Sequence, residues 1–244
     1  MGETSFVISL IRKIAIENKS PSAFFSLEMN SQQLMTRIIS QQTNISSKKL
    51  RLGFLSESEL ELVKTKIAAI EKAPLYVYDY PFITISDIEN TLLCSPPDFA
   101  KIIIIDSLQL ISKNKKDKAG KILNRKELTK ITFQLKKLAE KFNITILVLV
   151  HLNFQKKDSG KYYSRRPQLS DIRKYAPIDT YADLVLLLYR PEYYKIDEWD
   201  DEEQTSTTGE AEIIIAKNNY GILDNVRIQF KGSIGMFENL NPKL

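Results

Sequence analysis

Short apolar runs alternate with longer stretches of helical periodicity along most of this chain. The densest run is Ile102–Ile105, four consecutive isoleucines that end directly in Asp106. An unbroken β-branched run of this kind indicates a strand that is buried on both faces, as in the interior of a parallel sheet. Asp106 then falls at the carboxyl end of the strand, the edge where open α/β sheets bind ligands. A solvated aspartate at a turn is the alternative that the run alone leaves open.

The same alternation predicts the rest of the architecture. Apolar runs of strand length occupy 22–27, 75–79, 144–150, 182–189, 212–217 and 226–230. Stretches with one apolar face at helical spacing occupy 6–18, 29–42, 56–70, 84–93 and 124–142. This order indicates an α/β fold with a mostly parallel central sheet that has helices on both faces. The turn-like stretch 218–225 predicts an antiparallel hairpin at one edge of that sheet.

Composition narrows the class of protein. With 244 residues, 43% hydrophobic and 27% charged, the chain can form one domain over 1–244 around a large core. One cysteine, Cys94, and one histidine, His151, exclude a disulfide framework and a multi-cysteine or histidine-rich metal centre. The low cysteine content fits a reducing compartment, so we expect a cytoplasmic location. No apolar run approaches the length of a membrane span, so we expect no membrane partner.

Two carboxylates follow neighbouring strands of the predicted sheet. Glu28 comes directly after the run 22–27, as Asp106 ends the isoleucine run. If the strands are parallel, both side chains lie at one edge of the sheet. An aspartate there can hold Mg²⁺ near phosphates, and a glutamate can orient or deprotonate an attacking water. A surface carboxylate at a helix start is the alternative for Glu28.

The first residues contain part of a phosphate-binding pattern. A Gly-x-Thr sequence, Gly2-Glu3-Thr4, stands at the mouth of the first predicted helix. Backbone N–H groups at such a position bind phosphate, and the threonine hydroxyl binds Mg²⁺. Glu3 stands where the complete loop has its lysine. We take Gly2, Glu3, Thr4 and Ser5 as nucleotide-binding candidates, against the alternative of an ordinary helix start capped by Thr4.

Two basic segments, 113–126 and 155–166, follow strand ends on the same predicted edge. Lysine and arginine there alternate with Tyr162 and Tyr163, a combination that suits a phosphodiester backbone with stacked bases. A solvated surface loop is the alternative. The DNA-binding candidates are Lys113, Lys115, Lys116, Lys118, Lys156, Lys157, Lys161, Arg165 and Arg166.

The order of these segments resembles the DnaB-type replicative DNA helicases over essentially the whole chain. The matching stretches correspond to the C-terminal RecA-like motor domain and are 1–4, 24–37, 50–60, 74–88, 102–111 and 165–194. The resemblance implies a three-layer RecA-like fold, with ATP and Mg²⁺ as cofactors and single-stranded DNA as ligand. It gives Glu28 the role of catalytic base, and Thr4 and Asp106 the role of Mg²⁺ ligands. A homo-hexameric ring, and primase or a helicase loader as partners, are further implications.

Three positions depart from the family pattern. Glu3 replaces the phosphate-loop lysine, and His151 replaces a glutamine that resembles a sensor between phosphate and DNA. Lys217 is kept, but Asn219 replaces an arginine finger that acts on the neighbouring subunit's nucleotide. Such a finger can be worth about a thousandfold or more in the rate of hydrolysis. The catalytic candidates are therefore Glu28, Asp106, Lys217 and His151, with Asn219 in the nucleotide-binding set.

These departures leave two functions open. The first is a replicative helicase motor that translocates on single-stranded DNA at the replication fork, with impaired ATP hydrolysis. The alternative is a non-catalytic DnaB-like protein that binds DNA or an active helicase ring. The resemblance begins inside the phosphate loop and lacks the family's N-terminal helical domain, which fits a natural truncation or an excised fragment. Without that domain we expect a monomer or a weak oligomer.

Overall fold

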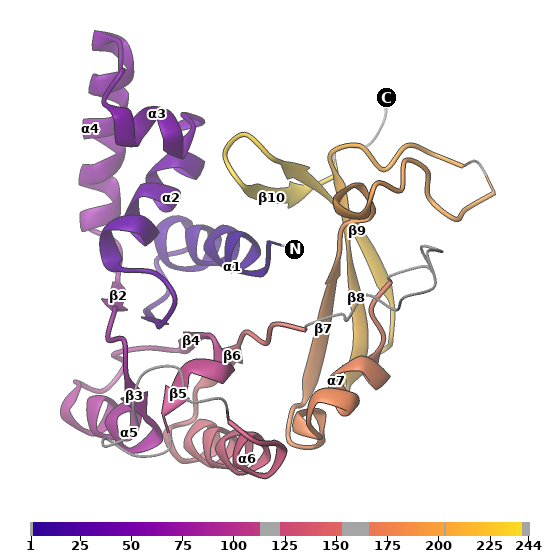
Figure 1. The fold of residues 1–244 in the computed structure, drawn as a ribbon. Coiled ribbons are helices and arrows are strands. Elements are labelled where there is room, and N and C mark those ends of the chain that lie inside the picture. The colour runs from indigo at the N-terminus through magenta and orange to yellow at the C-terminus, as the bar shows by residue number, and fades with distance from the viewer. Residues whose placement is uncertain (1, 113–122, 153–165, 203, 241–244) are drawn as a thin grey trace.

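The central layer of the protein is a parallel β-sheet. The computed structural model describes residues 2–112, 123–152, 166–202 and 204–240. The sheet has the strand order β2-β1-β4-β6. These strands are β1 (Ser22–Ser26), β2 (Leu75–Tyr78), β4 (Ile102–Asp106) and β6 (Thr145–Val148). The predicted parallel sheet is therefore confirmed, and its carboxyl ends share one edge (Figure 1).

Helices cover both faces of this sheet, as the sequence predicted. The α-helices of the described residues are α1 (Glu3–Ile11), α2 (Ser31–Thr43), α3 (Ser47–Leu52), α4 (Glu57–Glu71), α5 (Ile85–Cys94), α6 (Arg125–Phe142) and α7 (Leu169–Tyr175), of which α1, α2, α4, α5 and α6 pack on the sheet. A π-helical stretch, Arg12–Glu17, continues α1. Among the described residues, none of the helices combines the length and the apolar character that a membrane crossing requires.

Alternating side chains of the central strands divide the core in two. Phe24 and Ile104 pack with α1, α2 and α4 on one face. Phe25 and Ile105 pack with α5 and α6 on the other face. All five residues of β1 are consequently buried, which explains why the strands of this sheet appear in the sequence as unbroken apolar runs.

Reciprocal capping boxes fix the starts of α2, α4, α5 and α6. Ser56 begins α4, where its hydroxyl accepts a hydrogen bond from the Glu59 N–H while the Glu59 carboxylate accepts one from the Ser56 N–H. This pair fixes the start of the helix that the sequence predicted over 56–70. The equivalent pairs are Asn30 with Gln33, Thr84 with Asp87, and Asn124 with Glu127. Such caps satisfy N–H groups that have no partner inside the helix.

The C-terminal strands form a second, antiparallel sheet with the order β10-β9-β8-β7. Its members are β7 (Leu184–Tyr189), β8 (Glu210–Asn218), β9 (Asn225–Lys231) and β10 (Met236–Asn239). The antiparallel pairing of β8 with β9 is confirmed. The expectation that these strands complete the central sheet was wrong. In the described residues β7 pairs with the long strand β8, and the four strands form a sheet of their own. A short parallel pair, β3 (Ile83–Thr84) and β5 (Ile111–Ser112), lies apart from both sheets.

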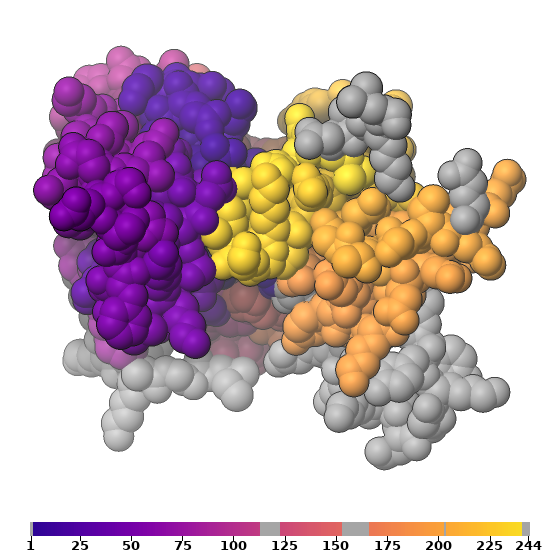
Figure 2. Space-filling view, turned by 90° about the horizontal axis from the view of Figure 1, so that it is seen from above, coloured from indigo at the N-terminus to yellow at the C-terminus, as the bar shows by residue number. Residues whose placement is uncertain are grey.

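Packing against helices holds the second sheet in place. Val185 and Leu187 of β7 join the core beneath α6. Phe237 of β10 meets Phe6 of α1 edge to face, with ring centroids 5.7 Å apart. Seen from above, the last strands (yellow) lie against the N-terminal helical body (indigo and purple) (Figure 2). Residues near the two ends of the chain therefore become neighbours.

Hydrogen bonds around Asp201 stabilise the connection between β7 and β8. The Asp201 carboxylate accepts hydrogen bonds from Arg227 Nη2 at 2.8 Å, the Thr205 N–H at 3.1 Å and the Thr205 hydroxyl at 2.9 Å. The hydrogen bond from Arg227, followed by those from Thr205, lowers the pKa of Asp201 to about 2. Arg227 in turn lies over the ring of Trp199, 4.4 Å from its centroid.

Replacing Asp201 with asparagine should lower the midpoint of thermal unfolding at pH 7. Because the folded-state pKa is depressed, the contribution of the carboxylate is complete above the ordinary value of 3.8 and is lost as the pH falls toward 2. The difference from the wild type should therefore be constant near neutrality and shrink below about pH 4. Calorimetric scans at several pH values measure it, with the exposed Asp200→Asn as control. A difference that does not change with pH would contradict this role.

Candidate nucleotide and metal site

Three neighbouring strands bring Glu28, Asp106 and His151 to one edge of the parallel sheet. Ser26 of β1 lies opposite Asp106 of β4, and the Leu27 N–H donates to the Asp106 carbonyl at 2.8 Å. Glu28 follows at once. On the other side, the Leu149 N–H donates to the Ile105 carbonyl at 3.0 Å, which continues β6 toward His151. The expectation that the carboxylates share an edge is therefore confirmed.

The side chains at this edge are in direct contact. His151 Nε2 lies 2.8 Å from Glu28 Oε1 and 3.8 Å from Asp106 Oδ1. The Thr4 hydroxyl donates to Asp106 Oδ2 at 2.9 Å, although 102 residues separate the two in sequence. The Ser107 hydroxyl donates to Glu28 Oε1 at 3.2 Å. We call Thr4, Glu28, Asp106 and His151 the edge cluster.

Burial makes the charged groups of the edge cluster costly in free energy unless they are paired. The Asp106 side chain is fully buried, and within the described part of the chain its Oδ1 accepts no hydrogen bond. The interaction with the Asp106 carboxylate, followed by the charges of Glu28 and Glu3, raises the pKa of His151 against the opposing effect of burial. A buried carboxylate oxygen without a donor is costly unless a cation approaches it. The residues on this side of the site therefore fit a bound metal ion.

The start of α1, where a phosphate would bind, is less suited to its ligand than the metal-binding residues are. Gly2 is the N-cap of α1 with φ 111°, and no side chain caps the helix. Thr4 lies inside the first turn and contacts Asp106, so the alternative of Thr4 as the helix cap is wrong. The Gly2 N–H donates to Glu3 Oε2 at 3.0 Å. A carboxylate of this chain thus takes the backbone donor that a phosphate oxygen would need.

Ser5 faces away from the edge cluster. Its hydroxyl lies 3.3 Å from the position that a β-carbon would take at Gly235, in the turn between β9 and β10. Its carbonyl accepts hydrogen bonds from Ser9 Oγ at 3.1 Å and Gln41 Nε2 at 3.4 Å. These contacts join α1 to α2 and the second sheet. A nucleotide-binding role for Ser5 stays a prediction.

Arg190 is a site residue that the sequence reasoning missed. It follows β7, and its guanidinium lies over the Phe230 ring at 3.7 Å from the centroid. A β-carbon built on Gly2 would be 3.7 Å from Arg190 Nη1, so the guanidinium lies beside the helix start. Burial lowers the pKa of Arg190, against the charges of Glu192 and Glu3. Only the folding of the second sheet against α1 brings this arginine near Gly2.

Lys217 and Asn219 bind groups outside the edge cluster. Lys217 Nζ donates to the Asp179 carbonyl at 2.9 Å. Asn219 Nδ2 donates to Asp183 Oδ1 at 3.3 Å. Both stand at the end of β8, next to the strongly exposed Tyr220. Within this chain they therefore do not contribute to the site at the sheet edge.

The candidate DNA-binding residues are only partly described. Lys113, Lys115, Lys116, Lys118, Lys156, Lys157, Lys161 and Arg165 lie outside the described residues. Arg166 is described, and its Nη2 donates to the buried Glu212 Oε1 at 2.7 Å. This ion pair is a structural constraint that the sequence did not reveal, because the two residues are 46 positions apart.

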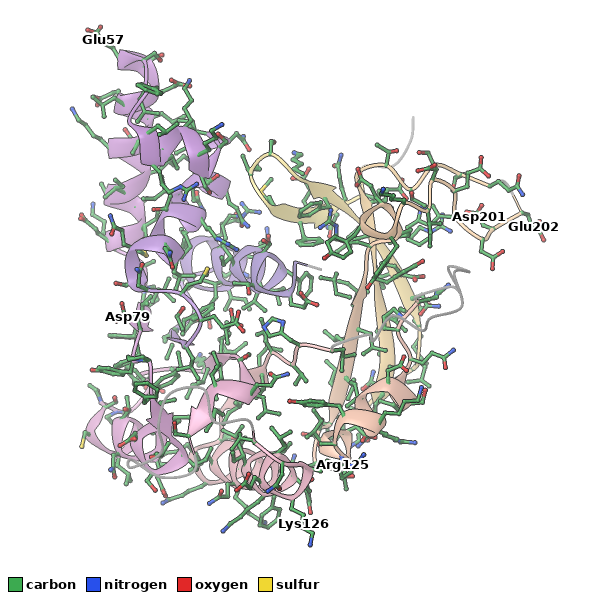
Figure 3. The ribbon with its side chains drawn as sticks, in the orientation of Figure 1. Glu57, Asp79, Arg125, Lys126, Asp201 and Glu202 are labelled. Carbon is green, nitrogen blue, oxygen red and sulfur yellow. The ribbon has the colours of Figure 1, made fainter. Side chains whose placement is uncertain are left out.

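A basic groove begins where the segment 113–122 rejoins the described chain. It has a volume of about 500 Å³ at the start of α6, and Arg125, Lys126 and Lys130 line it together with Thr129, Phe133, Pro177 and Tyr181. Arg125 donates to the carbonyls of Lys174 at 2.7 Å and Arg173 at 3.0 Å, which joins α6 to α7 (Figure 3). Lys126 is exposed beside it. Of these residues, Arg125 and Lys126 belong to the predicted basic segment 113–126.

Comparison with known proteins identifies the family. The model of the DnaB-like helicase C-terminal domain matches residues 1–239. The chain is 30% identical over 244 residues to the replicative DNA helicase DnaB of Geobacillus stearothermophilus, covering 100% of this chain and 51% of that protein. It is also 30% identical over 239 residues to a probable replicative DNA helicase of Trieres chinensis, covering 97% and 50% respectively. The chain thus spans about half the length of these relatives.

Solved structures give the same result. A DnaB-like replicative helicase, studied with its interactions with primase, matches with a TM-score of 0.81 and 25% identity, over 99% of this chain and 56% of that one. A second solved structure, an ATPase domain, matches with a TM-score of 0.81 and 25% identity, over 99% and 81%. The predicted RecA-like α/β fold is confirmed by these neighbours. This chain therefore belongs to the DnaB-like helicase C-terminal domain family.

Proposed function

We propose that this chain is the motor domain of a DnaB-like replicative helicase in which ATP hydrolysis is impaired. Nucleotide and Mg²⁺ are expected of the family in general. The observation that carries the proposal is the hydrogen bond from the Gly2 N–H to Glu3 Oε2 at 3.0 Å. It places a negative charge on the donor that would otherwise bind phosphate. The rate of ATP hydrolysis by the purified chain is the direct test.

The residues that would hold Mg²⁺ in a phosphoryl-transfer site are present in this chain. Thr4 Oγ1 and Asp106, which lie 2.9 Å apart, would hold Mg²⁺. Bound there, Mg²⁺ would neutralise charge on the phosphates. Glu28 would orient the attacking water, but its Oε1 lies 2.8 Å from His151 Nε2.

Neither Asn219 nor Arg190 supplies the positive charge that Glu3 removes from the phosphate-binding side of the site. Asn219 carries no charge, and its amide is bound to Asp183. Arg190 lies beside Gly2, but the negative charge of the nearby Glu3 offsets the positive charge of Arg190. Transition-state charge on a phosphoryl group needs preorganised cations. We therefore expect this chain to have lost ATP hydrolysis while it keeps the fold.

The alternative is a non-catalytic DnaB-like protein that acts by binding single-stranded DNA. The same Glu3 contact favours it, together with the basic groove at Arg125, Lys126 and Lys130. Such binding would depend on phosphate charge and would show no base specificity. ATP hydrolysis above background would exclude this alternative, and DNA binding is common to both functions.

Replacing Lys156, Lys157 and Arg165 with glutamate should abolish binding of single-stranded DNA. These residues supply charge to the second basic segment, and neutralised phosphates release counterions. For the wild type we expect a dissociation constant of roughly 10 µM or weaker at low salt, rising steeply with salt concentration. Fluorescence anisotropy with a labelled oligonucleotide measures both. Arg166 is left unchanged because it binds the buried Glu212.

A charge-matched control separates local binding from net charge. Lys48, Lys64 and Lys72 are exposed lysines in and after α3 and α4. Their replacement by glutamate changes the net charge by the same amount, but it should leave most of the DNA binding intact. Equal losses in the two triple variants, or none in either, would mean that residues 155–166 are only solvated surface.

A further inference from the structure

Glu28, Asp106 and His151 are arranged as a set of metal ligands that does not need a nucleotide. One ligand atom of each residue lies within 4.8 Å of the other two. Ligands bonded at about 2.0–2.2 Å to one ion lie about 3–4 Å apart. The distances of 2.8 Å from His151 Nε2 to Glu28 Oε1 and 3.8 Å to Asp106 Oδ1 lie close to that range. Glu28 is half-exposed and can adjust to a bound ion.

The two least exposed ligand atoms lack hydrogen-bond partners within the described residues. Asp106 Oδ1 is completely buried and accepts no hydrogen bond there. His151 Nε2 is also buried, and its contact with Glu28 lacks the direction of a hydrogen bond. The two atoms lie 3.8 Å apart. A buried carboxylate oxygen that accepts no hydrogen bond, 3.8 Å from a buried imidazole nitrogen, is a position where a cation can bind.

Surrounding groups hold the ligands in orientation. The Thr4 hydroxyl occupies Asp106 Oδ2 and so leaves Oδ1 for an ion. Ser107 donates to Glu28 Oε1 at 3.2 Å. Gln109 Nε2 donates to the His151 carbonyl at 2.9 Å and fixes the backbone of that residue. Such outer contacts orient metal ligands and raise affinity.

We propose that Glu28, Asp106 and His151 bind one divalent transition-metal ion, such as Zn²⁺ or Mn²⁺, in the absence of nucleotide and in preference to Mg²⁺. One imidazole nitrogen with two carboxylates suits these ions. Mg²⁺ demands octahedral oxygen ligands and gives up its water reluctantly. A divalent cation would also offset the charges of Asp106, Glu28 and the nearby Glu3. The proposal does not depend on whether ATP binds.

Calorimetric titration of untagged, metal-free protein with Zn²⁺, Mn²⁺ and Mg²⁺ tests the proposal. Cys94 is an exposed free thiol, so the titrations use a Cys94→Ser background. We expect one Zn²⁺ per chain, with Mg²⁺ binding at least about a hundredfold more weakly. His151→Gln and Glu28→Gln should each weaken Zn²⁺ binding by about tenfold or more. The exposed Glu61→Gln on α4 is the matched control and should have no effect.

The single histidine of the chain gives a second readout. In protein labelled with ¹⁵N-histidine, one equivalent of Zn²⁺ should shift the Nε2 resonance of the only imidazole. If the resonance does not move, or if His151→Gln and Glu28→Gln both bind Zn²⁺ like the parent, the ion is adventitious and the proposal is wrong. Circular dichroism of both variants checks that they are folded. Because no nucleotide is present, this outcome is independent of the ATPase result.

Discussion

ATP hydrolysis by the purified chain, with Mg²⁺ and single-stranded DNA present, is expected to be indistinguishable from background. Two defects act together. Glu3 holds the Gly2 N–H with a carboxylate, and Asn219 offers a neutral amide that is already bound to Asp183. Loss of a cationic finger alone costs about a thousandfold or more in rate. A coupled phosphate-release assay measures the turnover.

Two variants show whether any residual activity belongs to this site. Asp106→Ala removes the buried carboxylate that would hold Mg²⁺, so true turnover must disappear in it. Glu3→Lys removes the carboxylate from Gly2, yet it should recover little hydrolysis because Asn219 still supplies no charge. Moderate turnover in the wild type that Asp106→Ala abolishes would restore the active enzyme and overturn the proposal.

Replacing Arg166 with glutamate should destabilise the fold by about 2–4 kcal/mol, within the range for breaking a buried ion pair after allowing for partial exposure. The Arg166 side chain is 39% exposed, whereas that of Glu212 is 6% exposed. Burial raises the pKa of Glu212, and the charge of Arg166 opposes this effect. The variant would leave two carboxylates facing each other in a poorly solvated position. Urea unfolding measures the change.

The control for this experiment is Lys126→Glu, which makes the same charge change at an exposed position of α6. It should alter the free energy of unfolding by no more than about 0.5 kcal/mol. If the two variants are equally stable, the ion pair with Glu212 does not contribute to the fold. Arg166 would then be free to act with the other candidates for DNA binding.

Local patterns were sufficient to predict the central sheet. The isoleucine run of β4 and the apolar run of β1 are buried on both faces, and such strands show no alternation that could be confused with a surface strand. Short elements escaped, because α3 and β10 contain six and four residues and too few apolar positions for a period to emerge.

Long-range pairing explains what the sequence could not reveal. Nothing local distinguishes a strand that joins the central sheet from β7, which pairs with β8 instead. The same second sheet brings Arg190 beside Gly2 and Arg166 onto Glu212. Strand ends did predict that Glu28 and Asp106 share an edge. The contact of His151 with both carboxylates depends on side-chain orientation, which residue order does not specify.

Binding of a non-hydrolysable ATP analogue with Mg²⁺, measured by isothermal titration calorimetry, tests the central claim most directly. The claim is that Glu3 closes the phosphate side of a site whose fold and metal-side residues are retained. We expect no saturable heat up to about 1 mM analogue, which corresponds to a binding free energy weaker than about −4 kcal/mol. Saturable binding at micromolar concentration, lost in Asp106→Ala, would contradict it.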